Sequence, residues 1–165
     1  MLDAFLFFVI ATVASAAVLA YTALSVAEGD SEARADALAY AEDVRSTLMR
    51  TTLDDPWYVD GSGGPVHLGQ GITIEMFLLD EVQLLDRGLT RENFSVSNLA
   101  IRNVGESLVR PPFVHGVEAS IGSGTGRTVL WIGDGEGAPD DLLTASWTYH
   151  LNDIDAEIAV HIWYV

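Results

Sequence analysis

The chain has no cysteine and no lysine among its 165 residues. Without cysteine it forms no disulfide, no thiolate metal site and no cysteine nucleophile, so its fold does not depend on the redox state of its compartment. The eight basic residues are all arginines, against 24 aspartates and glutamates, and the net charge is -16 at pH 7. Because such an acidic surface repels phosphates, we expect no nucleic-acid partner.

The acidic, lysine-free composition is similar to that of proteins from salt-loving archaea. Near 1 M salt the Debye length falls to about 3 Å, so repulsion between surface carboxylates is largely screened. We therefore interpret the acidity as an adaptation to salt, with compositional drift in an acidic protein as the alternative. The hydrophobic content of 49% excludes a largely disordered chain.

An apolar run without any charge, glycine or proline extends from Ala4 to Ala27. As a helix these 24 residues would be about 36 Å long, enough to cross a hydrocarbon core of about 30 Å. No basic residue precedes the run, which argues against a cleavable signal peptide. We predict a hydrophobic helix within residues 1–27 and, because acidic residues follow it directly, an extracellular head over residues 28–165.

Three further segments of the predicted head have helical periodicity. Residues 31–52 are predicted to continue the hydrophobic helix as an amphipathic helix. Leu38, Val44 and Leu48 are expected to pack on a sheet. Glycines between Gly61 and Gly71 then predict a loop. We predict a helix over about 73–88, capped by Thr73 and ended by Gly88, and another over about 95–109. The apolar face expected for the latter consists of Val96, Leu99, Ala100, Val104 and Leu108, interrupted by Gly105.

The apolar period changes to two in the last third of the chain, residues 113–165. In residues 143–151, Leu143, Ala145, Trp147, Tyr149 and Leu151 alternate with polar residues, which predicts a strand with one buried face. Residues 117–121, 127–132 and 156–164 have similar patterns, and the short links favour an antiparallel meander of about four strands. The predicted fold class is α+β, with a long N-terminal hydrophobic helix, one or two short helices and a C-terminal antiparallel sheet.

The sequence contains no catalytic constellation, and we expect neither an enzyme nor a bound cofactor or metal. His150 and His161 lie on neighbouring predicted strands, but ordinary cross-strand neighbours are favoured over a metal pair. The four carboxylates of loop 134–141 suit Ca²⁺ only in general terms, so an acidic surface loop is favoured. The glycine-rich 122–126 segment lacks the Lys-Ser/Thr of a phosphate loop. The four tryptophans are interpreted as core residues, with a ligand groove as the alternative.

An apolar N-terminal segment, an amphipathic helix and a small β head without an active site together resemble type IV pilins and the pilin-like proteins of archaea. The resemblance implies that the segment anchors the subunit in the membrane and later packs with its copies in a filament, with the help of a pilus assembly machinery. The residues expected in that assembly are Phe5, Phe8, Ile10, Val13, Ala17, Leu19 and Leu24. This sequence departs from the family at Phe5, where type IV pilins usually have glutamate, and it shows no basic leader.

Two functional hypotheses follow. The first is a structural subunit, major or minor, of an extracellular archaeal filament on the cell surface. The alternative is a single-pass anchored extracellular protein that binds a partner and does not polymerise. The triplet Asn93-Phe94-Ser95 is an acceptor sequon, which makes Asn93 a possible glycosylation site on an extracellular head.

Overall fold

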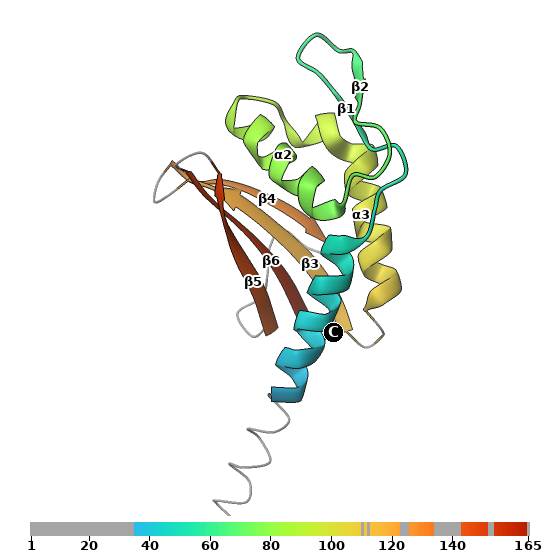
Figure 1. Ribbon diagram of the computed structural model, residues 1–165, viewed down its shortest axis with the longest axis vertical. Helices are drawn as coiled ribbons and strands as arrows, with labels where there is room; N and C mark the ends of the chain where they lie inside the picture. The colour runs from blue at the N-terminus through green and yellow to red at the C-terminus, as the bar shows by residue number, and fades with distance from the viewer. Residues whose placement is uncertain are drawn as a thin grey trace, which may run out of the picture. The chain divides into compact units, whose positions relative to one another are not determined.

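The computed structural model describes residues 35–109, 111, 113–122, 126–133, 143–151 and 154–164, without the side chains of 151, 154 and 164. The chain divides into two units, Met1–Ala37 and Leu38–Val165, and the second unit is called the head below. A helix occupies residues 35–50. It is followed by β1 (Trp57–Val59), β2 (Pro65–His67), α2 (Ile74–Asp86), the 3₁₀ helix η1 (Arg91–Phe94), α3 (Ser95–Leu108), β3 (Phe113–Ile121), β4 (Thr128–Gly133), β5 (Leu143–Leu151) and β6 (Ile154–Tyr164) (Figure 1).

The main sheet has the strand order β4-β3-β6-β5, and every neighbouring pair is antiparallel. The predicted simple meander is therefore wrong. The sheet consists of two hairpins, β3–β4 and β5–β6. They are joined by β3 and β6, which pair over nine residue pairs. Residues 134–142 connect β4 at one edge of the sheet with β5 at the other. A link of that length allows the crossing that a tight turn would forbid.

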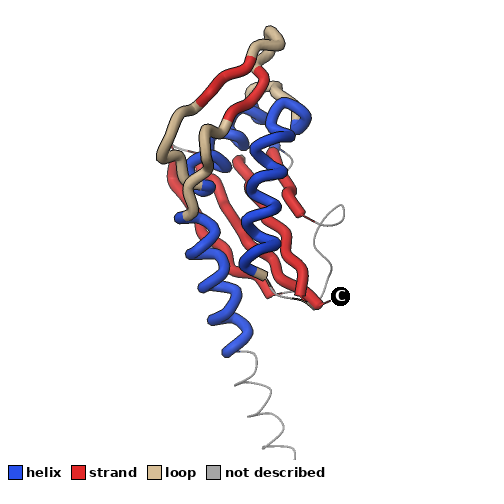
Figure 2. The backbone as a smooth tube through the Cα atoms, turned by 90° about the vertical axis from the view of Figure 1, so that its right-hand side faces the viewer, coloured by secondary structure: helices blue, strands red, loops and turns tan. Residues whose placement is uncertain are grey.

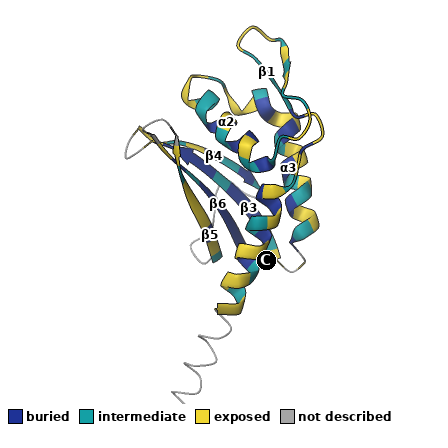
Figure 3. Cartoon of the chain, in the orientation of Figure 1, coloured by how far each residue is buried: buried dark blue, intermediate teal, exposed yellow. Residues whose placement is uncertain are grey.

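The helices cover one face of the main sheet (Figures 1 and 2). That face buries alternate residues of each strand, such as Val117 of β3, Leu130 of β4 and Val160 of β6. The helix over residues 35–50 packs on the same core through Ala41, Val44, Leu48 and Met49, as the helical period predicts. Leu38 does not join them, since its side chain is 43% exposed. The buried residues form a continuous layer between helices and sheet (Figure 3).

The predicted fold class needs correction at its N-terminal end and in its number of sheets. Among the described residues, none of the helices has the length and apolar character needed to cross a membrane. The long hydrophobic helix predicted within residues 1–27 is not seen, and those residues lie outside the described part of the chain. What the described residues form is three α-helices and two antiparallel sheets, a two-stranded one and a four-stranded one.

The two-stranded sheet replaces the loop predicted around Gly61 to Gly71. Trp57, Tyr58 and Val59 of β1 pair with residues of β2. One Oδ atom of Asp60 accepts hydrogen bonds from the backbone N–H groups of Ser62 and Gly64, which closes a tight turn between the strands. Glycine content predicted the turn, but strands of three residues are too short for a periodicity to be recognised.

Helix α2 begins and ends at the predicted residues. Thr73 Oγ1 accepts a hydrogen bond from the backbone N–H of Met76 at 3.2 Å, which satisfies a free donor of the first turn. Gly88 has a φ of +102° directly after the C-cap residue Arg87. Only glycine adopts this conformation without strain, so it ends the helix. Ile74, Phe77 and Leu78 are buried, and Leu85 and Leu89 are partly buried.

Helix α3 forms where it was predicted, but only part of the predicted face is covered: Val104 and Leu108 pack, partly buried, against the core. Val96 and Leu99 are 50% and 57% exposed, whereas Ser97, Ile101 and Gly105 are buried. Two contacts fix this orientation. Ser97 Oγ accepts a hydrogen bond from the backbone N–H of Trp57 and donates one to its carbonyl oxygen. A Cβ on Gly105 would lie 1.9 Å from Nε2 of His115, so only glycine fits between α3 and β3 here.

The close approach of Gly105 to His115 gives a test of this packing. A Gly→Ala change inside an exposed helix normally stabilises by about 1 kcal/mol. At Gly105 we expect the opposite sign, a loss of about 1–3 kcal/mol in the free energy of unfolding, because the imidazole of His115 must move. Urea unfolding of the full chain in mild detergent and molar salt, followed by tryptophan fluorescence, measures the change.

Gly61→Ala is the matched control, since an added Cβ at this turn position would meet nothing within 4 Å. Gly105→Ala should cost less unfolding free energy when it is introduced into His115→Ala than when it is introduced into the wild type. An unfolding free energy that rises in Gly105→Ala would contradict the packing described.

Candidate functional site

The two histidines considered as a metal pair are not brought together. In the β5–β6 register His150 lies opposite Asp155, whereas His161 lies opposite Thr144. His150 Nδ1 is 2.6 Å from Asp155 Oδ1 on the exposed surface. No group of three or more metal-ligating side chains occurs within the described residues.

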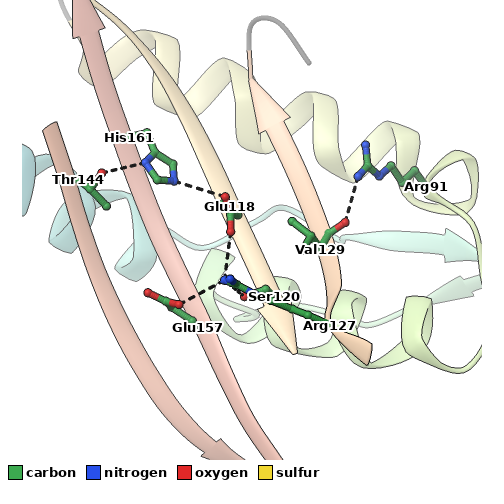
Figure 4. Close-up of polar contacts among 8 residues, drawn as sticks. All are labelled: Arg91, Glu118, Ser120, Arg127, Val129, Thr144, Glu157 and His161. Atoms are coloured by element: carbon green, nitrogen blue, oxygen red, sulfur yellow. Dashed lines mark hydrogen bonds and ion pairs between the residues drawn. The ribbon is translucent and has the colours of Figure 1, made fainter. Parts of the chain in front are cut away.

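His161 instead belongs to a polar network on the sheet face opposite the helices (Figure 4). Its Nδ1 is 3.0 Å from Thr144 Oγ1, and its Nε2 is 3.8 Å from a carboxylate oxygen of Glu118. Burial lowers the pKa of His161, although Glu118 and Glu157 oppose the shift. The imidazole is therefore held neutral over more of the pH range than a free histidine.

Arg127 joins the strands on this same face. Its Nη2 donates to Ser120 Oγ at 2.6 Å, to Glu118 at 3.2 Å and to Glu157 at 3.3 Å. One cation thus links a hydroxyl and two carboxylates of β3 and β6. Arg127 therefore ties β3 and β6 together, whereas two buried nitrogens of this face, His161 Nε2 and Trp131 Nε1, have no hydrogen-bond partner among the described residues.

The four tryptophans do not line one groove. Trp131 and Trp163 lie on the sheet face opposite the helices, with ring centroids 6.1 Å apart. Trp57 stacks with His67 on the small sheet. Trp147 was predicted to be buried, but β5 is an edge strand and this side chain is 55% exposed. The guanidinium of Arg45 lies over its ring, 5.1 Å from the centroid, in a cation–π contact.

Beside Trp147 is an open groove between the helix over residues 35–50, the start of α2 and β5. Its lining residues are Arg45, Ser46, Met49, Arg50, Glu75, Trp147 and Tyr149. Burial, together with Glu75, raises the pKa of Tyr149 to about 12. The arginines and the glutamate partly compensate each other, and no buried polar group of this groove lacks a partner among the described residues.

A smaller and more enclosed cavity, of about 180 Å³, lies between α2, η1 and the small sheet. Helix α2 contributes one face to it, with Phe77, Asp80, Glu81 and Leu84 at helical spacing. Tyr58, Leu68 and Phe94 form the opposite wall, and Gln83 and Arg87 complete the lining. We call this cavity the α2 pocket.

Glu81 is the unusual group in the α2 pocket, since its side chain is fully buried. Its Oε1 accepts a hydrogen bond of 2.7 Å from Asn98 Nδ2 on α3, which links the two helices. Its Oε2 has no hydrogen-bond partner in the part of the chain that the structure describes, and neither has Asn98 Oδ1. Burial raises the pKa of Glu81 to about 8, against the smaller opposing effects of Asn98 and Arg91. The carboxyl is therefore mainly neutral at pH 7.

The remaining predicted sites divide between described and undescribed residues. The assembly residues Phe5, Phe8, Ile10, Val13, Ala17, Leu19 and Leu24, and the acidic loop 134–141, lie outside the described residues. Asn93 is described. Its Oδ1 accepts from the backbone N–H of Thr90, and its Nδ2 donates to the carbonyl oxygen of Val59 at 2.7 Å. The amide of this sequon thus caps η1 and holds β1.

Comparison with known proteins gives no relative: no family model, curated protein or solved structure matches this chain.

Sequence reasoning missed Glu81. A glutamate inside an amphipathic helix normally lies on the solvated face, and only the position of α2 between β1–β2 and α3 places it inside. The one available indication was its place beside Phe77 and Leu78 at helical spacing.

Glu81 makes the stability of the head depend on pH. Its folded-state pKa of about 8 lies above the ordinary value of 4.5, so the folded state binds the proton more tightly than the unfolded state. This contribution is complete below pH 4.5 and is lost as the pH rises towards about 8, by at most about 1.4 kcal/mol per pH unit. We expect Glu81→Gln to remove that slope, so that the variant gains stability over the wild type as the pH rises from 5 to 8.5.

Urea unfolding at several pH values measures the difference between the two proteins, which cancels the titration of all other groups. Glu106→Gln is the control, because this half-exposed carboxylate pairs with Arg102 on the surface. Parallel stability curves for wild type and Glu81→Gln would show that Glu81 is not the titrating group.

Proposed function

We propose that this chain is a structural subunit of an extracellular filament of the type IV-like archaeal kind, assembled through its N-terminal apolar segment. The observation that carries the proposal is the uncharged run Ala4–Ala27, joined to a separately folded head. Twenty of its 24 residues are apolar, and these side chains must be covered. Lipid covers them in the membrane-anchored precursor, and the same segments of neighbouring copies cover them in the filament.

The head supports the proposal because it has a core of its own. The buried cluster runs from Ala41 to Ile162 and draws on every helix and all strands of the main sheet. The head therefore has the apolar core that a folded domain needs within its own unit, and the apolar segment is left to serve another purpose.

An apolar patch at the start of the head also fits this proposal. Leu38, the first residue of the unit, is exposed, and so is Phe113 at the start of β3. Tyr40 lies against Phe113, with ring centroids 6.3 Å apart. Apolar and aromatic side chains at the point where the chain enters the head suit contact with a membrane surface and later with a neighbouring subunit.

A structural role also agrees with the chemistry of the head. Arg127 bonds to Ser120 and Glu157 on the outer sheet face, and the charged residues of the chain are mostly carboxylates. Heads with this charge repel at low salt and approach one another when the repulsion is screened. The cell surface of a salt-adapted archaeon supplies such conditions, and the assembly machinery of its filaments is the implied partner.

The proposal is tested by placing a charge in the apolar segment. Val13→Asp or Ala17→Asp should abolish filaments, because a carboxylate buried among apolar segments has no partner. The head should stay folded, as judged by tryptophan fluorescence and circular dichroism. Sheared cell-surface material is sedimented and inspected by electron microscopy, with mass spectrometry to identify the subunit.

Two controls separate charge from mere substitution. Val13→Leu keeps the segment apolar, and Val96→Asp puts the same charge on an exposed position of α3. Both should form filaments. The proposal fails if the wild type forms none, or if Val13→Asp assembles as well as Val13→Leu.

A second candidate is a single-pass anchored extracellular binding protein that does not polymerise. The α2 pocket, with its buried carboxyl, is the observation that favours it. In that case detergent extraction yields monomers or small defined oligomers, and surface preparations contain no filament of this subunit.

A further inference from the structure

The lining of the α2 pocket combines aromatic side chains with the buried Glu81. Tyr58 and Phe94 stack with ring centroids 5.3 Å apart, and Phe77 meets Phe94 edge-on at 6.3 Å. These three rings line the cavity together with Leu68 and Leu84. A cavity of about 180 Å³ has room for a small organic molecule.

The polar side of the pocket is acidic. Glu81 Oε2 is buried and has no partner among the described residues, although Oε1 of the same carboxyl is held by Asn98. The carboxyl is thus fixed in position with one oxygen left over. Asp80, on the same helix, adds a second carboxyl to the lining. When the carboxyl is ionised, Oε2 is a buried acceptor without a partner, which is costly, and a donor that reaches it removes that cost.

The charges around Glu81 decide which kind of donor fits. Asp80 and Arg87 of α2 lie at the pocket, Arg91 of η1 acts on Glu81 from a distance, and Asn98 of α3 is neutral. An anion would meet two carboxyls. A neutral apolar molecule would leave Oε2 without a partner. A small cation with N–H donors and an alkyl body matches both the carboxyls and the aromatic rings, which attract cations through their faces.

We propose that the α2 pocket binds a small organic ammonium ion, which donates hydrogen bonds to Glu81 Oε2 while its carbon atoms lie against Tyr58, Phe77 and Phe94. The site is independent of filament assembly, since every residue that forms it belongs to the head. The proposed structural subunit would therefore also have a binding site for an amine.

The experiment is an isothermal titration of the full chain, in mild detergent and 1 M KCl at pH 8.5, with n-butylamine. Molar salt screens the general attraction of amines to an acidic surface, whereas a buried carboxylate is screened much less. We expect saturable binding with one site per chain. 1-Butanol, which has the same shape without the charge, and butyrate, which has the opposite charge, should bind at least about tenfold more weakly.

Two variants place the binding in the pocket. Glu81→Gln keeps the shape of the side chain and should weaken butylamine binding by about tenfold or more. Leu84→Phe fills the cavity while leaving Glu81 intact, and should also weaken it. Glu106→Gln, an exposed carboxylate on α3, is the control and should bind as the wild type does. Urea unfolding of each variant shows that the head is still folded.

The proposal is overturned if butylamine gives no saturable heat, if 1-butanol binds equally well, or if Glu81→Gln retains full affinity. Such results would mean that neutral Glu81 only bridges to Asn98 Oδ1 and holds α2 against α3. The filament test is unaffected by these results, because it depends on Val13 and Ala17 of the apolar segment.

Discussion

The pairing of β3 with β6 is the constraint on which the rest of the head depends. Nine residue pairs join the two hairpins into one sheet, from Phe113 opposite Tyr164 to Ile121 opposite Ala156. An isolated two-stranded hairpin is at best marginally stable, and neither hairpin alone offers a face wide enough for the helices. Once joined, the strands direct Val117 and Val160 towards the helices, and Glu118 and His161 to the opposite face.

The two faces of this sheet are stabilised in different ways. The helical side excludes water, and its apolar layer supplies the main free energy of folding. None of the described helices covers the opposite side, where Arg127, His161 and two glutamates hold β3, β5 and β6 in register. Surface ion pairs of this kind add little stability each. Because these groups are linked across three strands, they contribute more to fixing the strand register than to the free energy of folding.

Helix α2 carries the one buried carboxyl, among the described residues, that conflicts with the simple division between apolar core and acidic surface. Glu81 lies between two layers because β1–β2 and η1 cover the outer side of α2. Burying a carboxyl costs free energy, which the neutral form and the bond from Asn98 reduce without removing. The group is therefore a specific feature of the α2–α3 contact, in a chain whose other described carboxylates mostly face water.

Local chemistry could be predicted from the sequence alone. Thr73 and Gly88 define the limits of α2 through bonds and dihedral angles within one turn, and the alternation in residues 143–151 predicts β5. The uncharged run Ala4–Ala27 is likewise a property of composition. Partners distant in the sequence decided the rest. Contacts with His115 and Trp57 determine which face of α3 is buried. Trp147 is exposed because β5 is an edge strand, and Glu81 is buried because other segments cover α2. Periodicity records which residues share a face, but only packing between distant segments determines which face is covered.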